Sequence, residues 1–106
     1  MTTKNIFIHH VFFWLKDPSS EQDRQALLAG LEKLSKVQTI KMFHIGRPAN
    51  TSRGVIDTSY SLSWMLIFES PEDQDSYQVD PIHLKFVEEC QHLWQKVVVY
   101  DSVDAK

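Results

Sequence analysis

The apolar residues of this chain fall into runs with two different periods, and the first run is extended. Residues 6–15 are rich in β-branched and aromatic side chains, and both alternating faces of the run are mostly apolar. Such a segment is typical of a strand that is covered on both sides. His9 and His10 interrupt the run and it ends at Lys16, so it is too short to span a bilayer. The pattern therefore predicts a buried first strand.

The second run has helical spacing. Residues 17–20 end the strand, and Ser19 or Ser20 can cap a helix that continues to about Lys36. One apolar stripe at intervals of three and four residues follows the cap. It consists of Leu27, Leu28, Leu31 and Leu34.

The middle of the chain predicts two more strands joined by a loop. Residues 39–45 fit a strand, and residues 46–57 hold the Gly, Pro, Asn and Ser that favour a loop. Residues 58–68 show the clearest alternation, with Tyr60 and the apolar side chains up to Phe68 pointing one way and serines the other.

The last third predicts two helices and a final strand. Ser70-Pro71 and Asp80-Pro81 each place a capping residue before a proline at the first helical position. The first helix should end at residue 77 or 78 and the second at about residue 95. Residues 96–101 are rich in valine and complete the order β-α-β-β-α-α-β.

One antiparallel sheet with helices on one face is the simplest α+β architecture for this order. The helices can cover only one face of four strands, whereas residues 6–15 need cover on both faces. A second copy of the sheet would supply that cover, so we expect a homodimer with twofold symmetry.

Composition narrows the class of protein. The 106 residues fit one domain, residues 1–106, and the formal net charge of -3 argues against a nucleic-acid partner. Cys90 is the single cysteine, so no intramolecular disulfide can form, which fits a reducing compartment. The first residues lack a signal-peptide pattern. We expect a soluble, cytoplasmic protein with no membrane partner.

The candidate chemistry lies at the start of the last predicted helix. A helical wheel puts His83 in the middle of the apolar face, one turn inside the helix. Burial and the positive end of the helix dipole both disfavour the imidazolium, so the ring should be neutral and able to act as a general base. Tyr77 can face the same space across the Asp80-Pro81 break. The alternative is that both are ordinary core residues.

Other chemistry-bearing residues give weaker signals. His9 and His10 point to opposite faces of their strand, and no histidine pair has the spacing of a metal site. The chain has no glycine-rich phosphate loop, so no cofactor is expected. Cys90 faces the core as a packing residue. Asp101 ends the last strand, where it can orient a pocket histidine or lie in solvent as a strand-end acid.

Four segments in order resemble the stress-responsive α/β-barrel (Dabb) domain family. They are residues 9–17 (HHVFFWLKD), 67–70 (IFES), 77–83 (YQVDPIH) and 98–101 (VVYD). The resemblance covers nearly the whole chain. It implies a ferredoxin-like fold whose antiparallel four-stranded sheet closes with that of a second copy into a dimeric α+β barrel.

Barrels of the olivetolic acid cyclase type within this family have a tyrosine and a histidine that match Tyr77 and His83. The resemblance implies that His83 takes a proton beside a carbonyl, that Tyr77 stabilises the oxygen charge and that Asp101 orients the histidine. It also matches His9 to a pocket histidine. Trp64 would shrink the pocket if it faces it. The binding residues expected around the catalytic pair are His9, Asp101, Val11, Phe13, Trp64 and Val87.

Two functions follow. The first is a cofactor-free cyclase or lyase that uses the Tyr77–His83 pair on a small carbonyl or aromatic compound. The alternative is a non-catalytic dimeric module that binds a small hydrophobic ligand or serves a stress response, since the chain lacks an evident nucleophile, metal cluster or cofactor motif. A cofactor-free monooxygenase on the same scaffold is a third possibility by fold analogy.

Overall fold

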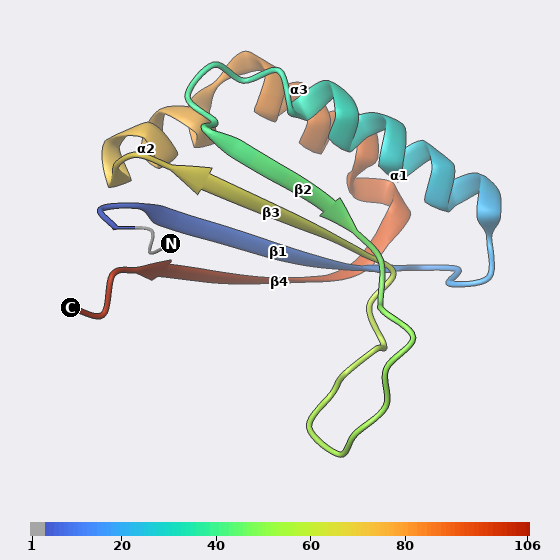
Figure 1. The fold of residues 1–106 in the computed structure, drawn as a ribbon. Coiled ribbons are helices and arrows are strands. Elements are labelled where there is room, and N and C mark those ends of the chain that lie inside the picture. Colours follow the sequence, from blue (N-terminus) through green and yellow to red (C-terminus); the bar gives the residue numbers. More distant parts are fainter. Residues whose placement is uncertain (1–3) are drawn as a thin grey trace.

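A four-stranded antiparallel sheet carries all the helices on one of its faces (Figure 1). The computed structural model describes residues 4–106. The strand order across the sheet is β2-β3-β1-β4, as expected for a ferredoxin-like α+β fold. The strands are β1 (Phe7–Leu15), β2 (Met42–Gly46), β3 (Leu62–Phe68) and β4 (Trp94–Val103).

The helices begin where the sequence supplies caps. They are α1 (Glu21–Leu34), α2 (Pro71–Val79), α3 (Pro81–Cys90) and the short 3₁₀ helix η1 (Gln91–Leu93). The Ser20 and Ser70 hydroxyls each accept a hydrogen bond from a backbone N–H three residues later, at 3.1 Å. Asp80 ends α2 and caps α3, because its carboxylate accepts a hydrogen bond from the Ile82 N–H at 2.8 Å. These bonds satisfy N–H groups that a helix start leaves free.

β1 lies at the centre of the sheet and is the strand on which the core is built. It pairs along its length with β3 on one side and β4 on the other. Its helix-facing side chains alternate with half-buried ones on the opposite, open face. The buried core between sheet and helices includes Val11, Phe13, Leu15, Leu27, Leu31, Leu34, Trp64, Leu66, Phe68 and Phe86.

β3 is shorter than its alternating pattern predicts. The strand begins at Leu62 rather than at residue 58, because its pairing with β2 ends at Ser63, opposite Gly46, and its pairing with β1 ends at Leu62, opposite Phe13. Residues 58–61 therefore have no second strand beside them and join the connecting loop, which extends away from the helices (Figure 1). Similarly, β2 begins at Met42 rather than at residue 39.

α3 is also shorter than predicted. It ends at Cys90, and Trp94 and Gln95, expected in the helix, begin β4. Trp94 pairs with Leu15 and packs its ring 5.0 Å from that of Phe13, measured between centroids. Pairing and packing on the sheet therefore outweigh the helical spacing of these residues. At its other end β4 continues past Asp101 to Val103.

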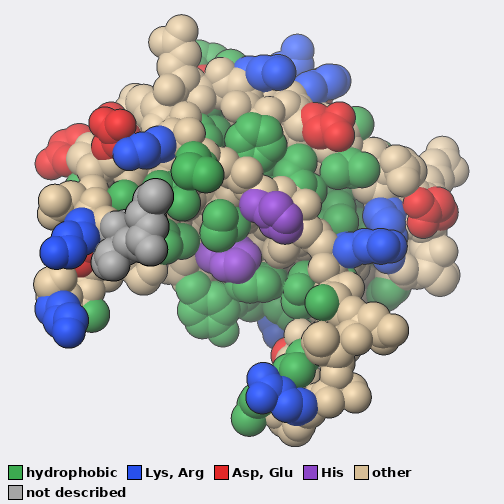
Figure 2. All heavy atoms as spheres, viewed as in Figure 1, with side chains coloured by type: hydrophobic (Ala, Val, Ile, Leu, Met, Phe, Trp, Pro, Cys, Tyr) green, Lys and Arg blue, Asp and Glu red, His purple; other side chains and the backbone are tan. Residues whose placement is uncertain are grey.

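The open face of the sheet is largely apolar and is not covered by a helix. Ile8, His10, Phe12 and Trp14 of β1 lie there half-buried. The His10 and Phe12 rings stack with centroids 4.3 Å apart. Figure 2 shows histidine side chains set among hydrophobic ones on the visible surface. Within residues 4–106, helices that combine the length and apolar character needed to cross a bilayer are absent.

Gly30 marks the closest approach of α1 to α3. A Cβ at this position would lie 2.5 Å from the Cys90 sulfur and 3.4 Å from the Phe86 ring. We expect Gly30→Ala to lower the free energy of unfolding by about 1 kcal/mol, since overpacking outweighs the better helix propensity of alanine. Urea unfolding measures this change. Gly54→Ala is the control, because a Cβ there meets no atom within 4 Å; equal stability of the two variants would contradict the close packing.

Candidate functional site

A cavity of about 160 Å³ lies between the helix-facing side of the sheet and helices α2 and α3. Its walls are mostly apolar, and its polar side chains come from β1, α2 and α3. The lining residues are His9, Val11, Phe13, Leu34, Trp64, Tyr77, Gln78, His83, Phe86, Val87, Trp94, Val97 and Val99. The sequence singled out seven of these; Asp101, the eighth candidate, reaches the cavity only through His9.

Tyr77 presents its hydroxyl from α2 and is 1% exposed. The Trp64 indole N–H donates a hydrogen bond to the Tyr77 oxygen at 3.1 Å. Burial raises the pKa of the Tyr77 phenol well above its ordinary value of 10, against the smaller opposing effect of Trp64. The phenol therefore stays protonated at neutral pH. Because its oxygen accepts from Trp64, its own proton remains available to a ligand.

His83 is the third residue of α3 and lies half-buried beside Tyr77, with 4.7 Å between the ring centroids. Burial lowers the pKa of His83 below 6.5, and the field of His9 adds to this; the backbone of Gln78 and the Asp80 carboxylate oppose it. Gln78 does not reach hydrogen-bonding geometry with Nδ1, which is buried and has no hydrogen-bond partner among residues 4–106. The ring is therefore neutral at pH 7.

His9 and Asp101 form a hydrogen-bonded pair across neighbouring strands. They are register partners on β1 and β4, and His9 Nδ1 lies 2.6 Å from Asp101 Oδ1. The His9 side chain is 7% exposed and that of Asp101 is 45% exposed. The resemblance implied that Asp101 orients His83, and this assignment is wrong: strand pairing brings the carboxylate to His9.

The sequence did not indicate every residue of the cavity. Trp94 was expected on the helix and lies on β4, and Val97 and Val99 follow it on the same helix-facing side as Asp101. Alternation of Val97, Val99 and Asp101 was the signal that could have found the two valines, whereas an irregularity in the register between Trp14 and Leu15 puts Trp94 out of phase with them. Trp64 does face the cavity, is 1% exposed and reduces its volume.

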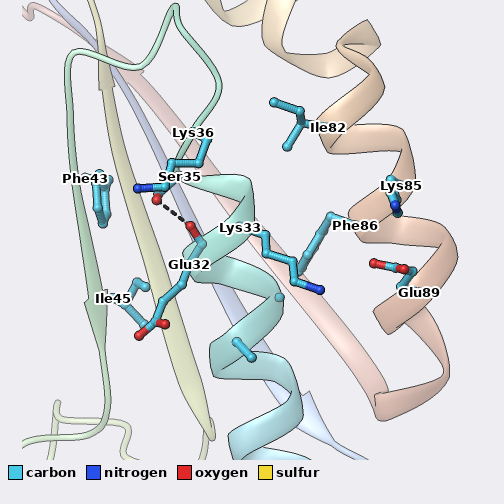
Figure 3. Close-up of a pocket in the computed structure, with 12 residues that line it drawn as sticks. Glu32, Lys33, Ser35, Lys36, Phe43, Ile45, Ile82, Lys85, Phe86 and Glu89 are labelled. Carbon is cyan, nitrogen blue, oxygen red and sulfur yellow. Dashed lines mark hydrogen bonds between the residues drawn. The ribbon is translucent and has the colours of Figure 1, made fainter.

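A larger hollow of about 920 Å³ lies between α1, α3 and β2, but it is less suited to chemistry (Figure 3). Phe43, Ile45 and Ile82 give it apolar surface, and charged side chains such as Lys33 and Glu89 lie around it. Phe86 lines this groove and the small cavity. The groove combines apolar surface with exposed charged side chains, whereas His9 and Tyr77 of the cavity are buried and hydrogen-bonded.

Two other kinds of site find little support. Within residues 4–106, groups of three or more side chains that could hold a metal ion do not occur. Burial raises the pKa of the Cys90 thiol, so it stays protonated and makes a poor nucleophile.

Comparison with known proteins places these features in a family. A model of the Stress responsive A/B Barrel Domain matches residues 7–104. No match was found among curated proteins. Among solved structures, a Dabb family protein with a ferredoxin-like fold from Mesorhizobium loti is 22% identical, with a TM-score of 0.79 over 95% of this chain and 98% of the other.

Two further structures share the fold. A hydroxynitrile lyase from Passiflora edulis is 20% identical, with a TM-score of 0.77 over 98% of this chain and 97% of the other. A dimeric ferredoxin-like protein of unknown function from Thermobifida fusca is 14% identical, with a TM-score of 0.76 over 98% and 95%. At these identities the likeness establishes the fold.

The lowered pKa of His83 predicts a dependence of stability on pH. As the pH falls, His83 of the unfolded chain, with a pKa near 6.5, binds a proton at a higher pH than His83 of the folded chain does. The stabilising contribution of His83 to the free energy of unfolding is therefore fully present above pH 6.5. This free energy falls as the pH drops below 6.5. We expect His83→Gln to weaken this dependence in urea unfolding between pH 7.5 and about pH 5. His92→Gln, at an exposed histidine, is the control; an unchanged dependence in His83→Gln would contradict the assignment.

Proposed function

The chain belongs to the stress responsive A/B barrel domain family, and we propose that it is a cofactor-free lyase acting on a small carbonyl compound. The observation that carries this proposal is the convergence of Tyr77, His83 and His9 on one apolar cavity. The phenol can donate a hydrogen bond to a substrate oxygen, and a neutral imidazole can accept a proton. Acid–base chemistry of this kind requires neither a metal nor a bound cofactor.

The size of the cavity supports a compact substrate. An apolar cavity of about 150 Å³ holds benzene, and this one measures about 160 Å³. A single aromatic ring or a branched aliphatic carbonyl of similar size would fill it. The Trp64 indole occupies the space that a long chain would need. We therefore propose that any likeness to the olivetolic acid cyclase type lies in proton transfer beside a carbonyl and excludes long polyketide tails.

The walls also limit which bonds such a lyase could break. In the cleavage direction an imidazole takes the proton of a substrate hydroxyl, the carbonyl forms and the electron pair of the broken bond leaves with the departing group. The lining residues include no lysine that could form a Schiff base. A departing group that is a stable anion by itself, such as cyanide, needs no such electron acceptor. The shared fold with a hydroxynitrile lyase supports this choice of substrate class.

Turnover of mandelonitrile, a cyanohydrin with one ring, tests the proposal. We expect benzaldehyde to form faster than in buffer, and Tyr77→Phe to lower kcat by on the order of 10²-fold because a donor to the substrate oxygen is lost. Absorbance of the aldehyde gives the rate. Tyr100→Phe, on the open face of the sheet, should retain the wild-type rate.

A panel of cyanohydrins of different sizes shows whether a lack of mandelonitrile turnover reflects substrate size or the absence of lyase activity. If neither mandelonitrile nor smaller aliphatic cyanohydrins are turned over, the lyase proposal fails. A rise in Tm with benzaldehyde would then favour the second function, a non-catalytic ligand-binding module, because a ligand that binds only the folded state stabilises it. The near-complete burial of Tyr77, which is 1% exposed, is the observation that favours this second function.

We further propose that the chain forms a homodimer through the open face of its sheet. Phe12 lies in an aromatic cluster there, with ring centroids 5.0 Å from Tyr60 and 6.0 Å from Tyr100. Met42 and Tyr100 are 59% and 66% exposed, and a second sheet would bury such side chains. Burial of the open face is the driving force we expect. Related folds from Thermobifida fusca and Bacteroides fragilis are described as dimeric.

Sedimentation tests the dimer. We expect the wild-type chain to sediment as a dimer at micromolar concentration, and Phe12→Asp to sediment as a monomer because the interface would have to bury a charge. Leu84→Asp, at an exposed position on the outer side of α3, should remain dimeric. A monomeric wild-type chain would rule out the proposed assembly.

A further inference from the structure

We infer that His9 is the general base of the cavity and that Asp101 is its positioning residue, an assignment that rests on the proposed function. This reverses the role that resemblance gave to His83. The two imidazoles that share the cavity differ in their hydrogen bonds: His9 is bonded to a carboxylate, and His83 Nδ1 has no partner among the described residues.

The bond to Asp101 fixes the tautomer of His9. The 2.6 Å separation of His9 Nδ1 and Asp101 Oδ1 is short for a nitrogen–oxygen hydrogen bond and is typical of a charge-assisted one. A carboxylate only accepts hydrogen bonds, so the shared proton is on Nδ1. The other ring nitrogen, Nε2, then has a free lone pair. His9 lines the cavity, so this lone pair belongs to a ring that a bound ligand can contact.

The same pair can stabilise the charge that proton uptake creates. When Nε2 takes a proton, the ring becomes an imidazolium with a carboxylate bonded directly to it. The Asp101 side chain is 45% exposed, so water solvates the far side of the carboxylate and its burial penalty is small. His9 therefore has one ring nitrogen, Nε2, free toward the cavity and the other, Nδ1, hydrogen-bonded to a carboxylate.

His83 lacks such a partner. Its buried Nδ1 makes no hydrogen bond among the described residues, and the carboxylate of Asp80 is engaged by the Ile82 backbone N–H. A proton added to His83 would place an imidazolium in a half-buried position without a direct counter-charge. His83 is therefore better suited to stay neutral and contact the substrate oxygen.

The Tyr77 ring lies near the rings of both histidines. Its ring centroid is 4.7 Å from that of His83 and 5.8 Å from that of His9. In the cleavage of a cyanohydrin, His9 Nε2 takes the hydroxyl proton and the carbon–cyanide electron pair leaves with cyanide while the carbonyl forms. Tyr77 donates a hydrogen bond to the carbonyl oxygen. The proton then passes from His9 to cyanide, which restores the neutral imidazole.

Two measurements test the assignment, and the first needs no turnover. In a ¹⁵N-labelled wild-type protein, we expect His9 to show the Nδ1–H tautomer by NMR, and Asp101→Ala to lose that preference. A wild-type His9 in the Nε2–H tautomer would overturn the inference. Asp104→Asn removes a nearby charge whose carboxylate bonds to the Asn5 backbone instead, so it should leave the His9 tautomer unchanged.

The second measurement follows proton abstraction by the general base. In D₂O, a base in the cavity exchanges the α-protons of acetophenone, which NMR follows without any carbon–carbon cleavage. We expect Asp101→Asn and His9→Gln to slow this exchange by on the order of 10³-fold, as loss of an orienting carboxylate does in catalytic triads. His83→Gln should exchange these protons faster than either His9→Gln or Asp101→Asn does. Asp101→Asn keeps the shape of the side chain, so the test stands even if His9→Gln does not fold.

The outcomes separate the two proposals. Exchange without mandelonitrile turnover retains His9 as the base and rejects the lyase. Exchange that depends on His83 and persists in Asp101→Asn rejects His9. Absence of exchange in the wild-type protein also rejects the inference, whatever the result with mandelonitrile.

Discussion

The structure depends on burying one strand that is apolar on both faces. β1 lies in the middle of the sheet, and the helices bury one of its faces through Val11, Phe13 and Leu15. Each such side chain contributes roughly 1.5–3 kcal/mol when fully buried. The opposite face, with Phe12 and Trp14, stays half-buried in the single chain. The cavity and the surface for the proposed second copy therefore lie on opposite sides of the same strand.

Strand pairing then assembles the site. β1 holds His9 opposite Asp101 of β4, and two residues further it holds Val11 opposite Trp64 of β3. Side chains on a strand alternate between faces, so a slip of one residue in β1 would move His9 to the open face. The register that buries the core is therefore the register that brings His9 and Asp101 together, and the stability of the fold and the geometry of the site have the same origin.

Local signals in the sequence predicted much of this arrangement. The caps Ser20, Ser70 and Asp80 start the three α-helices where expected, because capping is a short-range interaction. The ferredoxin-like sheet and the side of α3 that carries His83 also follow from local periodicity. The same reasoning put Trp94 in a helix, since its spacing fits α3 until the packing against Phe13 is known.

The remaining features depend on pairing between distant segments. His44 of β2 pairs opposite Met65 of β3, and this pairing is a property of the whole sheet that the segment around His44 does not determine. The partner of Asp101 was misassigned for the same reason: 92 residues separate it from His9. The volume of the cavity depends on how Trp64 and Phe86 pack, which composition alone does not determine.

Trp64 links the size of the cavity to its chemistry. The indole fills space next to Tyr77 and also donates to the Tyr77 hydroxyl at 3.1 Å. A smaller residue would enlarge the cavity, but it would also remove the bond that holds the phenol oxygen and leaves the phenol proton free for a ligand. Larger substrates therefore could not be gained at this position without loss of orientation at the reacting oxygen. The small cavity and the fixed phenol are two consequences of one side chain, which is why we favour a compact substrate over a long one.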